Sequence, residues 1–143
     1  MFAKPEDLAP DYVLISRRVV MQGDLSIGQR LFGGTLLAWI DESLAMLAVS
    51  ITGTPDIATR KMSEVEFFAP ARLCDQIEIW GRPAHLGRTS LSIECHVYAR
   101  RPADQNSKFI MISSCTMVFV ALDAEGKAFP WNPYAPSSSR TAK

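Results

Sequence analysis

The segment from residue 35 to residue 51 constrains the fold most, because no other stretch of comparable length has a helical pattern. Its sequence, TLLAWIDESLAMLAVSI, is apolar nearly all round, and a Gly-Thr-Pro run at residues 53–55 provides signals that end a helix. The stretch is nearly long enough to cross a bilayer. However, Asp41 and Glu42 lie near its centre, where each acid would cost roughly 2.5 kcal/mol or more. We therefore expect a helix that is enclosed inside a soluble protein.

The other segments with a clear period are typical of strands. Residues 88–100 alternate strictly between apolar and polar side chains, which indicates a sheet with one buried face. Residues 108–122 are apolar on both faces, as in a central strand or one buried at a subunit contact. Further strands are predicted at residues 12–21, 57–69 and 75–81. Strands joined by short connections pair most easily as an antiparallel sheet, so we expect an α+β fold with about five strands wrapped around one long helix.

Length, charge and cysteine content limit the class of protein. A chain of 143 residues fits one domain, which we place at residues 1–130, followed by a loosely ordered Pro/Ser-rich tail at residues 131–143. The 15 basic and 15 acidic residues cancel, which argues against general attraction to nucleic acid. Three cysteines without metal-ligand spacing fit a reducing compartment, and the N-terminus has no run of signal-peptide type. We expect a cytoplasmic protein that binds no metal, nucleic acid or membrane.

One acid interrupts the apolar surface of the predicted helix. At helical spacing, Asp41 shares a face with Leu37, Leu44, Ala48 and Ile51. A carboxylate removed from water costs several kcal/mol unless it is paired. Asp41 is therefore either a functional acid or a structural charge that an arginine or backbone donors satisfy at a subunit contact. Glu42 points about 100° away, and we expect it to be solvated or paired.

The start of the helix is a second candidate. Gly33 and Gly34 follow Phe32 where the first free N–H groups of the helix lie. These donors and the positive end of the helix dipole can polarise a carbonyl group, and glycine lets a ligand approach the backbone closely. The alternative is a flexible joint between loop and helix. Together with an acid seven residues further on, the pair describes half of a hydrolytic site.

Four segments resemble motifs of the hotdog-fold acyl-CoA thioesterases, particularly the short bacterial acyl-CoA hydrolases. They are LFGGTLLAWIDES, VEFFAPARLCDQIEI, HLGRTSLSIECHVY and CTMVFVALDAEGKAFP, and the resemblance covers about residues 12–130. It implies a hotdog fold and an enzyme that hydrolyses the thioester of acyl-CoA, with coenzyme A as part of the substrate and no other cofactor. It also implies a homo-oligomer, a dimer or a trimer of dimers, with each site built between subunits.

The resemblance also assigns roles to particular residues. Asp41 corresponds to the general base or nucleophile, and the backbone N–H of Gly34 or Gly33 to the donor that polarises the carbonyl. Ser26 stands where relatives often carry an asparagine that positions water or substrate. The turn at Gly87, Arg88, Thr89 and Ser90 is the candidate contact for coenzyme A, and Thr59 is a candidate lining residue near the acid. The alternative to an enzyme is a module that binds acyl-CoA without hydrolysing it, as a sensor or regulatory domain.

Overall fold

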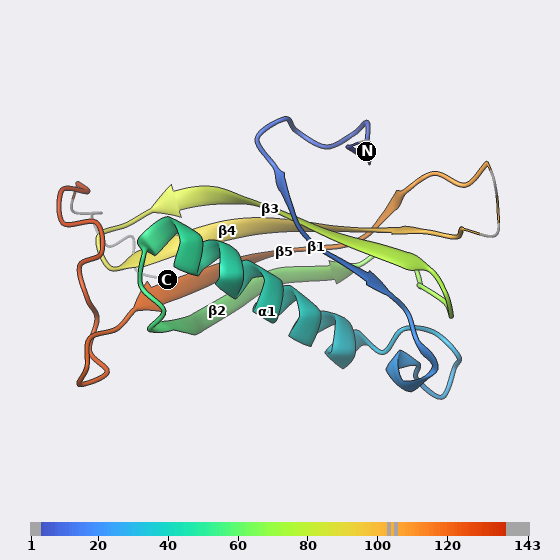
Figure 1. Ribbon diagram of the computed structural model, residues 1–143, viewed down its shortest axis with the longest axis horizontal. Coiled ribbons are helices and arrows are strands. Elements are labelled where there is room, and N and C mark those ends of the chain that lie inside the picture. Colours follow the sequence, from blue (N-terminus) through green and yellow to red (C-terminus); the bar gives the residue numbers. More distant parts are fainter. Residues whose placement is uncertain (1–3, 103, 105, 137–143) are drawn as a thin grey trace.

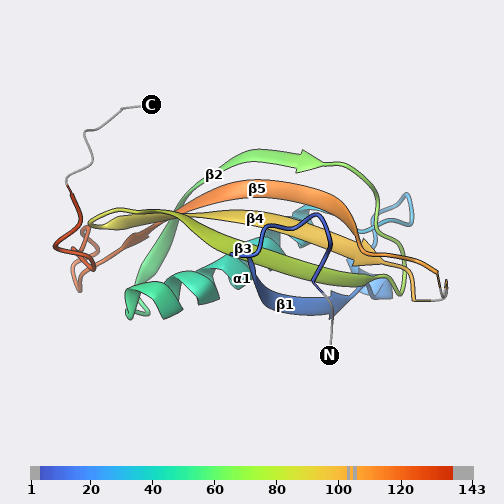
Figure 2. The ribbon, with the colours of Figure 1, turned by 90° about the horizontal axis from the view of Figure 1, so that it is seen from above.

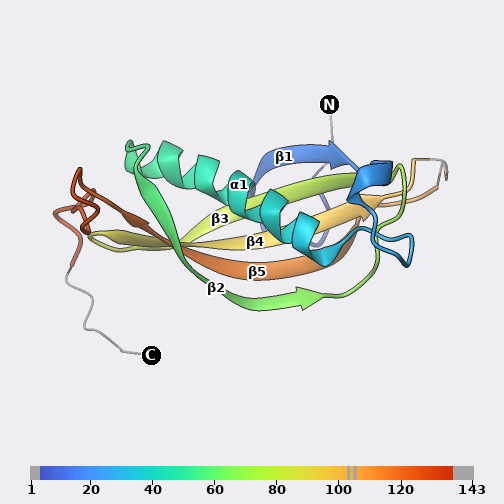
Figure 3. The same cartoon turned by 90° about the horizontal axis from the view of Figure 1, so that it is seen from below.

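The computed structural model describes residues 4–102, 104 and 106–136. Its elements are β1 (Val13–Val19), η1 (Gln22–Asp24), α1 (Gly33–Thr52), β2 (Ile57–Phe67), β3 (Gln76–Leu86), β4 (Ser90–Arg100) and β5 (Ile110–Ala121). The strands form one antiparallel sheet in the order β1-β3-β4-β5-β2 (Figure 1). The sheet curves around α1, which lies across one face (Figure 3). The predicted α+β fold of about five strands and one long helix is confirmed.

The position of β2 differs from simple pairing of consecutive strands. β2 pairs with β5 rather than with β3, so it forms one edge of the sheet and β1 forms the other. The reason is that α1 carries the chain from one edge of the sheet to the other before β2 begins. The connection from β2 to β3 then returns across the end of the sheet, where the Leu31 N–H donates to Ala71 O (2.8 Å) and the Val20 N–H to Asp75 O (3.0 Å).

β3 is longer than predicted, because it continues past Gly81 to Leu86 and includes Pro83. β1 pairs with β3 only as far as Gly81, whereas β4 accompanies β3 to its end. The outer part of β3 is therefore an edge, where a proline interrupts no further ladder. A register shift between Pro83 and His85 marks the same place.

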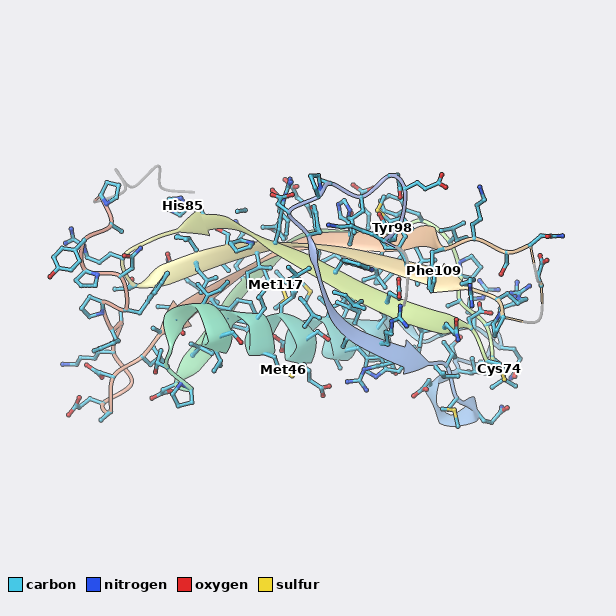
Figure 4. The ribbon with its side chains drawn as sticks, turned by 45° about the horizontal axis from the view of Figure 1, so that its top comes forward. Met46, Cys74, His85, Tyr98, Phe109 and Met117 are labelled. Carbon is cyan, nitrogen blue, oxygen red and sulfur yellow. The ribbon has the colours of Figure 1, made fainter. Side chains whose placement is uncertain are left out.

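The core lies between α1 and the inner face of the sheet, defined here as the face that contacts α1. Ile40, Leu44 and Ala48 of α1 are fully buried against this face. Figure 4 shows Met117 of β5 between sheet and helix, whereas Met46 of α1 points away from the sheet. A Cβ atom at Gly81 would lie 2.7 Å from Cδ1 of Ile15 and 3.0 Å from Cδ2 of Leu44. Glycine at this position therefore allows the helix to pack closely on the sheet.

By length and composition, α1 could cross a membrane, and the core helix of a soluble protein passes the same test. In this fold α1 contacts all five strands, and Asp41 and Glu42 lie in its middle. These contacts favour a core helix. Gly53 ends it in the left-handed conformation, with φ 72° and its N–H bonded to Val49 O.

Part of the outer face of the sheet, opposite α1, is covered by the N-terminal segment at residues 4–12, which crosses β3 and β4 (Figure 2). A second apolar cluster forms there around Leu8, Tyr12, Trp80 and Tyr98. Beside it lies a group of polar side chains that we call the outer-face network: Tyr12, Arg82, Glu94 and His96. The Tyr12 hydroxyl donates to Glu94 (3.2 Å), Arg82 bonds Glu94 through Nε and Nη2 (2.9 and 2.7 Å), and the rings of Tyr12 and His96 stack at 4.7 Å.

The C-terminal segment at residues 131–136 is the described part of the predicted tail, and it packs against the domain. Trp131 packs against the core and donates its indole N–H to Ser90 O (3.3 Å). Ala135 is buried, and its carbonyl accepts a hydrogen bond from Arg88 (3.3 Å). Trp131 supplies apolar surface that a composition-based reading of the prolines and serines misses. Residues 137–143 of the predicted tail lie outside the described residues, and the domain boundary at residue 130 stays a prediction.

Candidate active site

The start of α1 presents backbone donors that the chain does not use. Phe32 is the N-cap residue, its side chain makes no capping hydrogen bond, and the first turn contains no acid. The first bond of the helix runs from the Leu36 N–H to Phe32 O (3.1 Å). Among the described residues, no acceptor is bonded to the N–H groups of Gly33 and Gly34. The donors and the positive end of the helix dipole are thus available to a carbonyl oxygen.

Asp41 is half-buried on the side of α1 that faces β2. Thr59, at a register shift in β2, donates its hydroxyl to Asp41 Oδ1 at 2.6 Å. No cation among the described residues forms an ion pair with the Asp41 carboxylate. Within one chain this excludes an arginine partner, one of the explanations left open by the sequence. A carboxylate oriented by one hydroxyl keeps a free oxygen that can accept a proton from water.

Glu42, the neighbouring acid, is engaged elsewhere. Arg18 of β1 bonds Glu42 Oε2 at 2.9 Å, and the Arg18 guanidinium lies over the Trp39 ring at 5.1 Å. The Glu42 side chain is 64% exposed. It is therefore a surface ion pair, as its orientation on the helix predicts, and it offers a natural comparison for Asp41.

Ser26 lies in the loop between η1 and α1. Its hydroxyl donates to Arg30 O (3.0 Å), and its own N–H bonds the same carbonyl (2.8 Å). The hydroxyl thus closes its own loop. No hydrogen bond among the described residues joins it to Asp41 or to the start of α1. The loop itself is anchored beside the helix start, because the Phe32 N–H donates to Asp24 O (2.9 Å).

The turn predicted to contact coenzyme A connects β3 to β4. It lies near the C-terminal end of α1, away from Gly33 and Gly34 (Figure 1). The Gly87 N–H donates to Ser90 O (2.9 Å), and a Cβ atom at Gly87 would lie 3.0 Å from that carbonyl, so the turn needs glycine there. Thr89 O accepts from the Ala121 N–H (2.9 Å). Arg88 is exposed, apart from its bond to the C-terminal segment.

The fold thus brings together Asp41 and Thr59, which lie 18 residues apart. It places the glycine pair at the start of the same helix and the predicted turn near the other end. Among the described residues, no group of three His, Cys, Asp or Glu side chains could hold a metal ion. Sequence reasoning missed the outer-face network. Its members lie on separate strands and in the N-terminal segment, and no motif joins Tyr12 to His96.

Comparison with known proteins identifies relatives of this chain and of its fold. The family model of the thioesterase superfamily matches residues 28–104. The acyl-CoA thioester hydrolase YciA of Salmonella typhimurium is 26% identical over 125 residues, which cover 87% of this chain and 93% of that protein. A hexameric hotdog fold thioesterase of Campylobacter jejuni is 28% identical with a TM-score of 0.74, covering 82% of this chain and 88% of the other. An acyl-CoA hydrolase of Staphylococcus aureus, solved with butyryl coenzyme A, coenzyme A and coenzyme A disulfide, is 27% identical with a TM-score of 0.73, covering 82% and 70%.

The fold and the site define a hotdog enzyme of the thioester hydrolase class. The chain belongs to the thioesterase superfamily. The predicted fold, the resemblance to hotdog thioesterases and the enzyme class are confirmed. The roles assigned to single residues and the cytoplasmic location stay predictions.

Proposed function

We propose that this thioesterase hydrolyses acyl-CoA to a free acid and coenzyme A. One observation carries the proposal. Among the described residues, Asp41 has no cation partner and a single hydroxyl donor, and it lies on a helix whose first N–H groups bond no acceptor. An acid held for structural reasons would be expected to have a partner that neutralises it. The Salmonella and Staphylococcus relatives are acyl-CoA hydrolases, which supports acyl-CoA as the substrate.

The proposed mechanism uses the backbone N–H groups at the start of α1 and the side chains of Asp41 and Thr59. The thioester carbonyl oxygen accepts hydrogen bonds from the N–H of Gly33 or Gly34, which stabilise the negative charge that develops on it. Asp41, oriented by Thr59, takes a proton from a water molecule, and the oxygen of that water bonds to the carbonyl carbon. The tetrahedral intermediate then collapses, the C–S bond breaks, and coenzyme A leaves as a thiolate. The proton on Asp41 returns to that thiolate or to solvent.

The geometry of α1 indicates whether the glycine pair and the Asp41 of one active site come from the same subunit or from two subunits. Asp41 lies seven residues beyond Gly34, about 10 Å along the helix axis. Within one chain, this separation is longer than a single water molecule spans between a carboxylate and a carbonyl carbon held at the glycine pair. A second copy with its helix antiparallel would bring its Asp41 towards the glycine pair of the first. We therefore propose a homo-oligomer with sites between subunits, and the Campylobacter relative is a hexamer.

The proposed arrangement also gives the turn at residues 87–90 a role. It lies near the C-terminal end of α1, where an antiparallel partner helix would begin. Arg88, exposed at this turn, can form a forked contact with a phosphate of coenzyme A. The hydroxyls of Thr89 and Ser90 are further donors. Ser26, in the loop beside the glycine pair, contributes a hydroxyl oxygen that can still accept a bond from water or substrate.

The direct test is thiol release from a panel of acyl-CoAs of different chain length, followed with a thiol reagent. The proposal predicts saturable turnover with at least one of them. Saturable binding of acyl-CoA without thiol release would contradict hydrolysis and favour the sensor alternative.

Complementation tests whether two chains build each site. One chain carries Asp41→Asn and the other Gly34→Val, and the two are co-expressed with different tags. If a site takes its glycines from one chain and its acid from the other, each mixed dimer regains one intact site. Mixed oligomers then show roughly a quarter to a half of wild-type activity, whereas either variant alone shows little. No recovery in the mixed oligomer would contradict a shared site.

A further inference from the structure

Two phenylalanine rings flank the glycine pair at the start of α1. A Cβ atom at Gly34 would lie 2.7 Å from Cε1 of Phe32, and one at Gly33 would lie 3.6 Å from Cζ of Phe67. Phe32 is the N-cap residue, and Phe67 is the last residue of β2. We call this pair of rings the aromatic collar, because each ring lies against one of the two glycines.

The collar is exposed but anchored. Phe32 is 56% exposed and Phe67 is 52% exposed, so two large apolar side chains remain partly in water beside unused N–H donors. Their backbones are fixed, since the Phe32 N–H bonds Asp24 O (2.9 Å) and the next residue after Phe67 bonds Ile112 O through its N–H (2.8 Å). Exposed apolar surface at an anchored position is typical of a surface that a ligand or partner covers.

The collar limits the space around a bound carbonyl group. A carbonyl oxygen accepting from the glycine N–H groups lies about 2.9 Å from the nitrogen. The carbon atom next to the carbonyl group, the acyl α-carbon, then lies within roughly 5 Å of the same backbone. The rings of Phe32 and Phe67 lie against the Cβ sides of Gly34 and Gly33, and we infer that they border this zone. A CH₂ group at the α-carbon packs against them, whereas a methyl branch there competes with ring atoms for the same volume.

We propose that the aromatic collar of Phe32 and Phe67 makes this enzyme selective for acyl groups without a branch at the α-carbon. The inference rests on the proposed acyl-CoA hydrolysis and specifies which substrates that site accepts. It concerns only the α-carbon, because atoms further along the acyl chain lie beyond the glycine pair. Chain length is therefore a separate property, set elsewhere in the site.

The test compares butyryl-CoA with isobutyryl-CoA, which have the same atoms and differ only in the branch. We expect wild-type kcat/KM to be at least roughly tenfold higher for the linear substrate, the usual discrimination for one misplaced methyl group. In Phe67→Ala the ratio should fall to about threefold or less. Phe67→Leu keeps most of the apolar volume and should retain most of the preference. Isovaleryl-CoA, branched one carbon further out, should respond little to Phe67→Ala.

Two results would overturn the inference. One is a wild type that hydrolyses the linear and the branched substrate equally well. The other is a Phe67→Ala variant, folded and of normal oligomer size, whose ratio stays within twofold of wild type. Phe32→Ala provides the same measurement if Phe67→Ala does not fold. Absence of thiol release from every acyl-CoA would overturn the proposed function as well, whereas release that ignores the branch overturns the collar alone.

Discussion

The outer face and α1 both carry polar groups, including a carboxylate. On the outer face most of these groups bond one another, whereas on α1 most of them have no partner among the described residues. On the outer face, Arg82 and Tyr12 both bond Glu94 beneath the N-terminal segment. The His96 ring stacks on Tyr12 and contacts its hydroxyl through Nε2, although its Nδ1 atom has no hydrogen-bond partner among the described residues. Along α1, the N–H groups of Gly33 and Gly34 and the carboxylate of Asp41 have one hydroxyl partner between them within the described part of the chain. A set of catalytic residue types is therefore a poor guide to a site when its members already pair with each other. Unused bonding capacity beside exposed apolar surface is the reason that we place the proposed site on α1.

The outer-face network also has the titration behaviour of a structural cluster. Burial raises the pKa of Tyr12 to about 12. Burial likewise lowers the pKa of His96 below its ordinary value, against the opposing effect of the Glu94 charge. These groups thus favour their neutral forms near pH 7. Such a cluster stabilises the attachment of the N-terminal segment, and we expect it to contribute little to hydrolysis.

The largest expected effect is on catalysis by the α1 site. Asp41→Asn keeps the size and the bond from Thr59 but removes the base, and kcat should fall by about 10²–10⁴-fold. Stability, measured by denaturant unfolding, should change little. Glu42→Gln on the same helix is the matched control, because its carboxylate pairs with Arg18 at the surface, and it should retain near-normal kcat. Near-normal turnover in Asp41→Asn would contradict the assignment of Asp41 as the general base.

The next largest expected effect is on stability, and it comes from a residue on the outer face of the sheet, away from the proposed active site. Glu78 is 1% exposed and accepts hydrogen bonds from Arg17 and from the Trp80 indole N–H (3.2 Å). Glu78→Ala leaves both donors without this acceptor and should lower the free energy of unfolding by about 3 kcal/mol, near the lower end for a broken buried pair. At a temperature where the variant is folded, kcat should stay within about twofold of wild type.

The comparison for Glu78→Ala is Glu42→Ala, which removes the exposed carboxylate partner of Arg18. Exposed ion pairs contribute less than about 1 kcal/mol, so this variant should unfold near the wild-type denaturant midpoint. An equal loss of stability in the two variants would contradict the importance of burial. A loss of kcat in Glu78→Ala at full folding would contradict the division between the two regions.

A smaller effect is expected from Thr59. Thr59→Val keeps the shape of the side chain but removes the hydroxyl that donates to Asp41, and kcat should fall by roughly tenfold, as for one hydrogen bond to a charged group. Thr59→Ser should restore most of the rate. Equal kcat in Thr59→Val and wild type would show that the Thr59 hydroxyl does not act through Asp41.

The smallest effect concerns the pH dependence of stability at His96. Because the folded pKa of His96 lies below its ordinary value of 6.5, the unfolded chain takes up the proton first as pH falls. The stability from neutral His96 is thus complete above about pH 6.5 and declines below it. Arg82, Glu94 and Asp7 are the charged groups that act on this ring. Between pH 7.5 and 5.5, wild type should lose slightly more Tm than His96→Gln; an equal or greater loss in the variant would contradict this.

Much of the fold could be predicted from local patterns. The strict alternation over residues 88–100 and the apolar helix with one interrupting acid favoured a sheet wrapped around a helix. The position of β2 at the far edge of the sheet could not be predicted. The order of strands at the edges depends on where the chain emerges from α1, and no repeat of apolar residues in the sequence encodes that position. The length of β3 was underestimated for a related reason: Pro83 is acceptable only where no neighbouring strand continues.

The candidate site divides in the same way. Asp41 and the glycine pair could be found because each violates a local rule, an acid on an apolar face and two glycines at a helix start. The bond from Thr59 to Asp41 depends on the register of β2 against the helix, so sequence supplied only a loose suggestion. The aromatic collar and the outer-face network depend on contacts between distant segments, and no spacing signals them.

The most direct test of the account is to observe where an acyl-CoA carbonyl binds. A hydrolysis-resistant analogue with CH₂ in place of the thioester sulfur keeps the carbonyl group, and its binding can be followed by NMR of the backbone amides. We predict that the amide resonances of Gly33 and Gly34 shift on saturation, while those of Tyr12 and His96 on the outer face do not. Unchanged glycine resonances, together with shifts at Tyr12 and His96, would contradict the placement of the site at the start of α1.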